Sequence, residues 1–224
     1  MDKRYAGSMK IVQRVAEFLT NTLDKHLPAI QFFTERIVEY PFVHSNIERK
    51  GKILDVGCGK SFLPFELASR GHEVYGIDLI DYPHSITHPN FKYIRGDARK
   101  MPFKSSFFDV VVSVSVLEHL VEFGPNEDER VVDEIARVLK PNGKFILTLP
   151  FGKRMIFRGK IKVYDLKLLK ELLTKFEIIK IEFAKKKGEV WVPASLKEVE
   201  NLRHPKSNGW PCSRAIALVV AKKR

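Results

Sequence analysis

One stretch constrains the fold of this chain more than any other: Lys52-Ile53-Leu54-Asp55-Val56-Gly57-Cys58-Gly59-Lys60-Ser61. Apolar residues lead into an acid and a close pair of glycines, and a helical pattern follows. This order predicts a buried strand that ends in a tight turn and continues into a helix. The two glycines permit positive φ and leave no side chain between the backbone and a ligand. Alone, the turn is also compatible with an ordinary strand-to-helix connection, so the residues downstream decide.

Strand and helix patterns alternate after this turn. Strands are predicted over residues 53–56, 73–77, 91–95, 108–114, 144–149, 177–183 and 215–221, and helices over 62–70, 127–139 and 165–175. The repeated β-α-β order predicts a mainly parallel α/β sheet with helices on both faces. Residues 79–90 contain Pro83 and Pro89, so a loop is expected there in place of a crossover helix.

Two amphipathic helices are predicted before the glycine turn. Apolar residues recur at helical spacing over residues 8–25 and again from Ile30 to Tyr40, and Pro41 is expected to end the second helix. Residues 1–50 are therefore assigned to an N-terminal helical extension that packs on the main domain or forms a lid. The main domain covers residues 51–224, with an insertion at about residues 188–213 that contains a short helix over 195–202.

Composition excludes some classes of protein and leaves others open. No apolar run approaches the length of a membrane span, and no signal-peptide core follows Met1 to Lys10, so a cytoplasmic protein is expected. The net charge of +12 is compatible with a nucleic-acid partner, an anionic substrate or a solvated surface. Two cysteines make no disulfide framework, and abundant Lys and Glu with two Gln are typical of a heat-adapted protein.

Acidic residues stand at the ends of the first three predicted strands. Asp55 precedes the glycine turn, Asp78 follows the second strand, and Asp97 follows the third. In open α/β sheets, ligands bind at the carboxyl ends of the strands. Asp78 lies about 20 residues beyond the glycine turn, a distance at which a carboxylate accepts from the two hydroxyls of a ribose. Phe62 occupies the last glycine position of the dinucleotide pattern Gly-x-Gly-x-x-Gly, which disfavours a nicotinamide cofactor.

At these positions the chain resembles the class I methyltransferases that use S-adenosylmethionine, and most of all the group that modifies small molecules. The matching motifs are Ile53-Leu54-Asp55-Val56-Gly57-Cys58-Gly59, Val74-Tyr75-Gly76-Ile77-Asp78, Gly96-Asp97-Ala98, Phe107-Phe108-Asp109-Val110-Val111, Leu117-Glu118-His119 and Arg137-Val138-Leu139-Lys140-Pro141-Asn142-Gly143. The resemblance implies a Rossmann-like, seven-stranded sheet whose last strand is antiparallel. Ser61 departs from the family, which often has another glycine there, but a serine can still cap the following helix.

The resemblance implies a role for each matching position. Asp55 and the turn Gly57-Cys58-Gly59 would hold the methionine part of the cofactor, and Asp78 would hold the ribose. The remaining cofactor contacts would come from Leu79 packing on the adenine, Asp97 on the adenine amino group, the Ala98 backbone facing the ring, Met101 covering it, and Ser113 near the methionine end. Asp109 stands at the beginning of its strand, on the far side from the site, and is expected to be structural.

His119 is the candidate general base, because imidazole titrates near neutrality and this position follows the fourth strand. Glu118 would orient His119 or contact the end of the cofactor. The pair is also compatible with hydrogen bonds to the backbone alone. A base is needed only when the acceptor loses a proton of high pKa, because the sulfonium is a good leaving group. No metal site is expected: His84 and His88 are four residues apart, but prolines oppose a helix there.

The acceptor pocket is expected above the ends of the fourth and fifth strands. Several segments are predicted to form its walls: the N-terminal helices, Phe123, residues 151–164 and the insertion between Trp191 and Trp210. Arg154, Arg158 and Lys160 would attract an acidic acceptor or face solvent. Cys212 is expected to be a plain thiol, and the fourth strand ends without the Pro-Pro-Tyr type of motif used on nucleobase amines.

We therefore expect a cytoplasmic enzyme that moves a methyl group from S-adenosylmethionine to a small-molecule acceptor by in-line transfer. An RNA methyltransferase acting on tRNA or rRNA is the alternative that the positive charge favours. A non-catalytic, S-adenosylmethionine-binding subunit of a partner protein is a third alternative. No pattern in the sequence predicts the oligomeric state.

Overall fold

The computed structural model describes residues 33–81, 87–157, 159–188, 190–204, 206–207, 210–211 and 214–224. The helix predicted over residues 8–25 lies outside them, as do His84, Arg158 and Cys212. One sheet has the strand order β3 (Phe91–Arg95), β2 (Glu73–Asp78), β1 (Lys52–Val56), β4 (Phe108–Val114), β5 (Leu139–Pro150), β12 (Ala215–Lys223), β8 (Phe176–Lys187) and β9 (Val190–Ala194).

The predicted Rossmann-like sheet is confirmed. β3, β2, β1, β4 and β5 pair in parallel, and the last strand, β12, is antiparallel to both of its neighbours, β5 and β8. All seven predicted strands are present. The insertion supplies an eighth, β9, which pairs antiparallel with β8 at the edge of the sheet. Valine and tryptophan favour a strand there, and an edge position tolerates Pro193.

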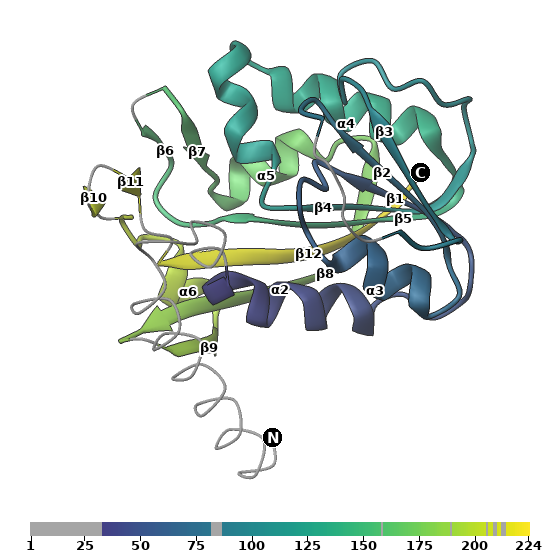
Figure 1. Cartoon of the computed structure of the whole chain (residues 1–224). Helices are drawn as coiled ribbons and strands as arrows, with labels where there is room; N and C mark the ends of the chain where they lie inside the picture. The colour runs from purple at the N-terminus through teal and green to yellow at the C-terminus, as the bar shows by residue number, and fades with distance from the viewer. Residues whose placement is uncertain are drawn as a thin grey trace, which may run out of the picture.

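Helices cover both faces of the sheet, as predicted (Figure 1). α4 (Glu127–Val138) and α5 (Leu166–Leu172) lie on one face, where Val131, Val132 and Ile135 pack with apolar residues of β1, β4 and β5. α2 (Phe33–Ser45) and α3 (Leu63–Ser69) lie on the other face, where Leu63 and Leu67 pack with the alternate residues of these strands. Strands covered on both faces are apolar throughout, which explains the run of valines in β4.

Several boundaries agree with the sequence analysis. β3 and β4 begin and end at the predicted residues. The Asp165 carboxylate accepts a hydrogen bond of 2.7 Å from Leu168 N and so caps α5, as predicted. The short helix of the insertion, α6 (Leu196–Val199), begins with a capping box of Ser195 and Glu198. No helix among the described residues has the length and apolar character that a membrane-spanning segment requires.

The prediction that Pro41 ends the second helix is wrong. α2 continues through Pro41 to Ser45. Proline removes one backbone donor and strains one turn, but it does not forbid a helix that is held by its neighbours. Phe42 and Val43 follow directly and are 5% and 0% exposed in the core beneath α2. The packing of these two side chains therefore outweighs the local cost of the proline.

Residues 151–164 contain a hairpin that the sequence analysis did not predict. β6 (Met155–Phe157) pairs antiparallel with β7 (Ile161–Val163), and a separate two-stranded ladder joins β10 (Lys206–Ser207) to β11 (Trp210–Pro211). Lys162 Nζ and Tyr164 Oη each donate to Asp128 Oδ2 at 2.7 Å. All three side chains are buried, so this satisfied network attaches the hairpin to the first turn of α4.

Candidate cofactor-binding and active site

The carboxyl ends of β1, β2, β3 and β4 lie along one edge of the sheet, because these strands are parallel. The strand order reverses at β1, which lies between β2 and β4. At such a switch point the connections leave in opposite directions, and a crevice opens above the strand ends. The glycine turn follows β1 at this switch point.

The glycine turn has a backbone conformation that other residues rarely adopt. Gly57 has a φ of 69° and Gly59 a φ of 49°, both in the left-handed region. Gly57 N donates a hydrogen bond of 2.8 Å to Ile77 O, which ties the turn to the end of β2. A Cβ atom at position 57 would lie 2.6 Å from both methyl carbons of Val116. Both conformation and space therefore require glycine at position 57.

Asp78 joins the glycine turn to the loop after β2. Its Oδ2 accepts from Gly59 N at 2.9 Å, and its Oδ1 accepts from Ile80 N at 3.0 Å. Each carboxylate oxygen has a further lone pair, so the half-buried group retains acceptor capacity for a ligand. Leu79 and Ile80 are 47% and 56% exposed. An acid for two hydroxyls and an apolar surface for a ring thus lie next to each other.

Arg99 holds the Asp97 carboxylate. The Arg99 guanidinium donates to both oxygens, with Nη2 2.7 Å from Oδ2, and the backbone N of Arg99 donates to Oδ1 at 2.9 Å. The Arg99 side chain lowers the pKa of Asp97, so the carboxylate is ionised. Arg99 also bonds Glu127 and stacks 4.9 Å above the exposed Phe123 ring. An adenine amino group would have to share Asp97 with Arg99, and that role of Asp97 stays a prediction.

Two other residues predicted to contact the adenine are less exposed than Leu79. Met101 is 4% exposed in the core, and its backbone N donates to Glu134 Oε2 at 2.8 Å. Ala98 is half-buried and packs against the same core. Their contacts with an adenine stay predictions. Such contacts would involve the backbone and only a small exposed part of each side chain.

Asp55 and Cys58 are both buried at the glycine turn. Burial raises the pKa of Asp55 to about 7, an effect that Asp78 increases and Arg36 opposes. Burial, with Asp55 and Asp78, also raises the pKa of the Cys58 thiol, so it stays protonated. The Cys58 Sγ atom would lie 2.6 Å from a Cβ on Gly76 in β2. Cys58 therefore directs its side chain toward the sheet and leaves only its backbone for a ligand.

Ser113, Glu118 and His119 lie at or after the end of β4. Ser113 is fully buried, and its Oγ has no hydrogen-bond partner among the described residues. Glu118, on the 3₁₀ helix η2 (Leu117–Phe123), is 3% exposed, and its Oε2 is likewise unpartnered within the described part of the chain. Burial raises the pKa of Glu118 to about 8. His119 is exposed, and partial desolvation lowers its pKa. Adjacent residues of a 3₁₀ helix point about 120° apart, which explains why Glu118 is buried while His119 is exposed.

These features fit a ligand in which an adenosyl group carries an amino acid. They are a turn without protruding side chains, a carboxylate with unused lone pairs at Asp78, an exposed apolar surface next to it, and buried carboxyl groups. Residues 54–147 match the family model of the methyltransferase domain. Over this segment the chain is similar to the class I S-adenosylmethionine-dependent methyltransferases. Sterol 4-C-methyltransferase strm-1 of Caenorhabditis elegans is 35% identical over 103 residues, which are 42% of this chain and 29% of that protein. A ubiquinone biosynthesis O-methyltransferase of Coxiella burnetii is 29% identical over 50% of this chain and 49% of that protein.

Solved structures agree with this methyltransferase fold. An S-adenosylmethionine-dependent methyltransferase of Methanosarcina mazei superposes with a TM-score of 0.59 at 22% identity, over 82% of this chain and 97% of the other. The 1,6-didemethyltoxoflavin-N1-methyltransferase of Burkholderia thailandensis, with S-adenosylhomocysteine bound, gives 0.61 at 13% identity, over 96% and 88%. The matched part of this chain spans about half or less of the two curated relatives named above.

Three residues of α2 reach the candidate site, and the sequence analysis missed all of them. Tyr40 Oη lies 2.7 Å from Ser61 Oγ, which also accepts from Leu63 N at 3.1 Å at the start of α3. Arg36 and Glu39 form an ion pair beside the end of β4. The spacing of 36, 39 and 40 puts these polar side chains on one face of the helix, which is the signal that would have found them.

Several predicted walls of the acceptor pocket lie elsewhere. Trp191 and Phe151 are 2% and 0% exposed in the cores on the two faces of the sheet, so they support the site instead of lining it. Phe123 and Arg154 are exposed. Tyr164 is buried at the base of the hairpin, where burial, Asp128 and, to a smaller extent, Glu118 raise the pKa of its hydroxyl. Within the described ranges no three side chains are grouped to hold a metal ion.

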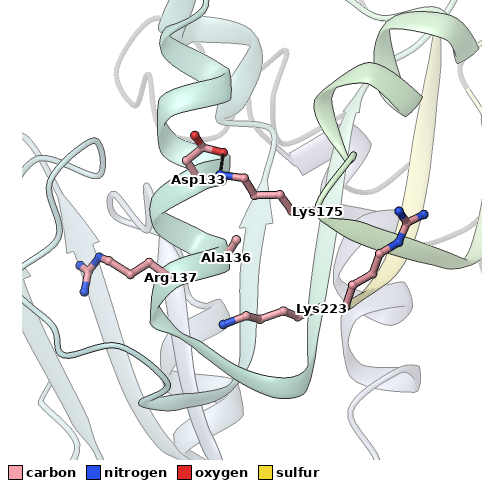
Figure 2. A pocket seen from close by; sticks show the side chains of 6 residues that line it. Asp133, Ala136, Arg137, Lys175 and Lys223 are labelled. Carbon is pink, nitrogen blue, oxygen red and sulfur yellow. Dashed lines mark ion pairs between the residues drawn. The ribbon is translucent and has the colours of Figure 1, made fainter.

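A depression of about 430 Å³ lies at the opposite edge of the sheet (Figure 2). It is lined by Asp133, Ala136, Arg137, Lys175, Lys223 and Arg224, and Lys175 pairs with Asp133 at 2.6 Å. β12 is antiparallel, so its last residues adjoin the beginning of β5. The depression is therefore remote from the glycine turn and forms no part of the candidate site.

Proposed function

We propose that this protein transfers a methyl group from S-adenosylmethionine to a small-molecule acceptor. The observation that carries the proposal is the pair of hydrogen bonds by which Asp78 joins the glycine turn to the loop after β2. These bonds place a carboxylate with unused lone pairs beside a turn without side chains, at the point where the strand order reverses. The bound cofactor supplies a methyl group already activated on a sulfonium. The protein's own tasks are then to hold the cofactor, to align the acceptor and to exclude water.

The residues around the glycine turn would each contact a different part of the cofactor. Asp78 would accept from the ribose hydroxyls with the lone pairs that Gly59 and Ile80 leave. Leu79 would cover the adenine. Asp55 would accept from the amino group at the methionine end, where Arg36 supplies the complementary cation for the carboxylate. The remaining predicted contacts, from Gly57, the Cys58 backbone, Asp97, Ala98, Met101 and Ser113, belong to the same proposal.

Glu118 is the base that the geometry supports best, and His119 is its alternative. The Glu118 carboxyl is buried next to Glu39 and Arg36, which alter its pKa in opposite directions, and its Oε2 is free to accept a proton from a ligand. A pKa of about 8 suits proton transfer near neutral pH. His119 is exposed and would need to turn toward the acceptor.

Glu118→Gln should lower turnover about 100-fold, the low end of what a general base contributes. A base acts only when deprotonated, so the wild-type rate should rise with pH and level off above about 8, and the variant should lose this dependence. The pH-rate profile of both proteins, on any acceptor found, is the measurement. A pH dependence that survives in Glu118→Gln and disappears in His119→Ala would assign the base to His119.

The same substitution should stabilise the protein at high pH. The folded-state pKa of Glu118 lies above its ordinary value of 4.5, so the folded state binds this proton more tightly than the unfolded state. Stability is therefore lost as pH rises between about 4.5 and 8. Glu118→Gln avoids that loss, and its melting temperature should exceed the wild-type value at pH 9 and not at pH 4. An equal difference at both pH values would contradict the raised pKa.

The side chains at the methionine end of the cofactor site favour a small-molecule acceptor over RNA. Asp55, Glu39 and Glu118 are all buried there, and the Arg36 guanidinium is paired with Glu39, so this group of side chains offers no unpaired cation to the phosphates of RNA. The names of the relatives refer to a sterol, to ubiquinone biosynthesis and to 1,6-didemethyltoxoflavin, all small molecules.

Transfer of a radiolabelled methyl group from S-adenosylmethionine tests the proposal. Label should enter compounds from a metabolite extract and not total RNA. Label in RNA alone would support the RNA alternative and contradict the proposal. Binding of the cofactor without transfer to either pool would support the non-catalytic subunit.

A further inference from the structure

Glu39 on α2 is a carboxylate with no exposed surface, and three donors satisfy it. Its Oε1 accepts from Thr148 Oγ1 at 2.6 Å and from Ser115 Oγ at 2.7 Å, and its Oε2 accepts from Arg36 Nη1. Removing a carboxylate from water is costly, and a well-packed apolar side chain is often at least as stabilising in such a place. Fold stability alone therefore gives little reason for a carboxylate at position 39.

One arm of this network holds the turn after β4. Ser115 has a φ of 52°, which is uncommon for a residue other than glycine. Its backbone N donates to Thr148 O and Oγ1, each at 3.1 Å, while its hydroxyl donates to Glu39. Val116 comes next, and its methyl groups occupy the space beside Gly57. Glu39 is therefore linked to the glycine turn through Ser115 and Val116.

The other arm holds Arg36. Besides its bond to Glu39, Arg36 Nη1 donates to Val114 O at 3.4 Å, and the side chain is 22% exposed. Its charge opposes the rise in pKa of both Asp55 and Glu118, so it faces the two buried carboxyls of the site. A planar guanidinium bound to a fixed carboxylate keeps one orientation. Without Glu39, Arg36 would be free to turn toward solvent or toward Asp55.

We propose that Glu39 is a positioning residue for cofactor binding, which it promotes without touching the cofactor. It fixes the turn that packs on Gly57, and it fixes the guanidinium that faces the methionine end. The helix α2 thereby belongs to the binding site as well as to the core. This inference rests on the proposed function, because it presumes that the cofactor lies at the glycine turn.

Calorimetric titration with S-adenosylhomocysteine separates the two arms. Glu39→Gln keeps an oxygen for Thr148 and Ser115 but turns a donor toward Arg36, whereas Glu39→Ala loses all three partners. We expect Glu39→Gln to weaken affinity about tenfold, the equivalent of one hydrogen bond to a charged group, and Glu39→Ala to weaken it further. Thr148→Val removes one donor of the turn arm at nearly constant volume and should cause a smaller loss.

Asp128→Asn is the matched control. Asp128 is also a buried helix carboxylate with a cationic and a hydroxyl donor, but it anchors the β6–β7 hairpin and not the glycine turn. It should lower the melting temperature and leave the affinity within about twofold. Wild-type affinity in Glu39→Gln, or equal losses in Glu39→Gln and Asp128→Asn, would overturn the proposal. If Glu39→Gln fails to fold, wild-type affinity in Thr148→Val would overturn it. Failure of the wild-type protein to bind would instead refute the proposed function.

Discussion

Asp78→Ala should weaken the binding of S-adenosylhomocysteine about 100-fold. A carboxylate that accepts from two ribose hydroxyls contributes about 1.5 kcal/mol or more for each, and about 3 kcal/mol corresponds to a factor of roughly 100 in affinity. The substitution also releases Gly59 N and Ile80 N, which Asp78 now holds at 2.9 Å and 3.0 Å. Isothermal calorimetry of the wild-type and variant proteins measures the difference.

Two further variants show whether the loss of affinity in Asp78→Ala comes from the carboxylate at position 78. Asp78→Asn keeps one acceptor oxygen and should give an intermediate loss. Glu73→Gln removes a carboxylate from the other end of β2, where Glu73 pairs with Lys52 at 2.8 Å on the surface, and should leave the affinity unchanged. Wild-type affinity in Asp78→Ala, or an equal loss in Glu73→Gln, would remove the ribose assignment.

Gly57→Ala should destabilise the fold by about 2–5 kcal/mol and abolish cofactor binding. An alanine at a φ of 69° costs about 1–2 kcal/mol, and crowding in a packed region adds about 1–3 kcal/mol. The crowding is specific, because the new Cβ would lie 2.6 Å from both Val116 methyl carbons. Urea denaturation measures the free energy of unfolding, and calorimetry measures the loss of binding.

Gly159 provides the matched control for this substitution. Its φ is 68°, nearly that of Gly57, but among the described residues other than its chain neighbours no atom lies within 4 Å of the position that its Cβ would take. Gly159→Ala should therefore show the conformational cost alone, about 1–2 kcal/mol. Adding Val116→Ala to Gly57→Ala should recover part of the steric cost. Equal destabilisation at positions 57 and 159 would show that Val116 does not restrict the glycine turn.

The sequence predicted the parallel part of the fold well because its signals are local. β4 is a run of apolar residues between turns, and Asp165 starts α5 through its own side chain, so both boundaries follow from the chain itself. The prediction that Pro41 ends its helix was wrong because the deciding contacts are not local. The effect of this proline on the helix depends on how firmly Phe42 and Val43 pack against the sheet, and that contact is made by residues remote in sequence.

The candidate site was predictable only where residues follow strands. Asp55, Asp78 and the two glycines stand at strand ends, so topology alone gathers them at one edge. Arg36 and Glu39 belong to a helix upstream of the first strand, and their approach to Ser115 and Thr148 spans 76 and 109 residues from Glu39. No local pattern encodes such contacts. Asp97 illustrates a further limit of motifs, since its motif says nothing of Arg99, which holds both of its oxygens.

Direct titration of the wild-type chain with S-adenosylhomocysteine tests the central claim, that the loops at the carboxyl ends of β1, β2 and β4 bind an adenosyl amino acid. We expect one molecule to bind per chain, with a rise in melting temperature and with displacement by S-adenosylmethionine. A folded protein that releases no heat on titration and melts at the same temperature with and without the compound would contradict this claim.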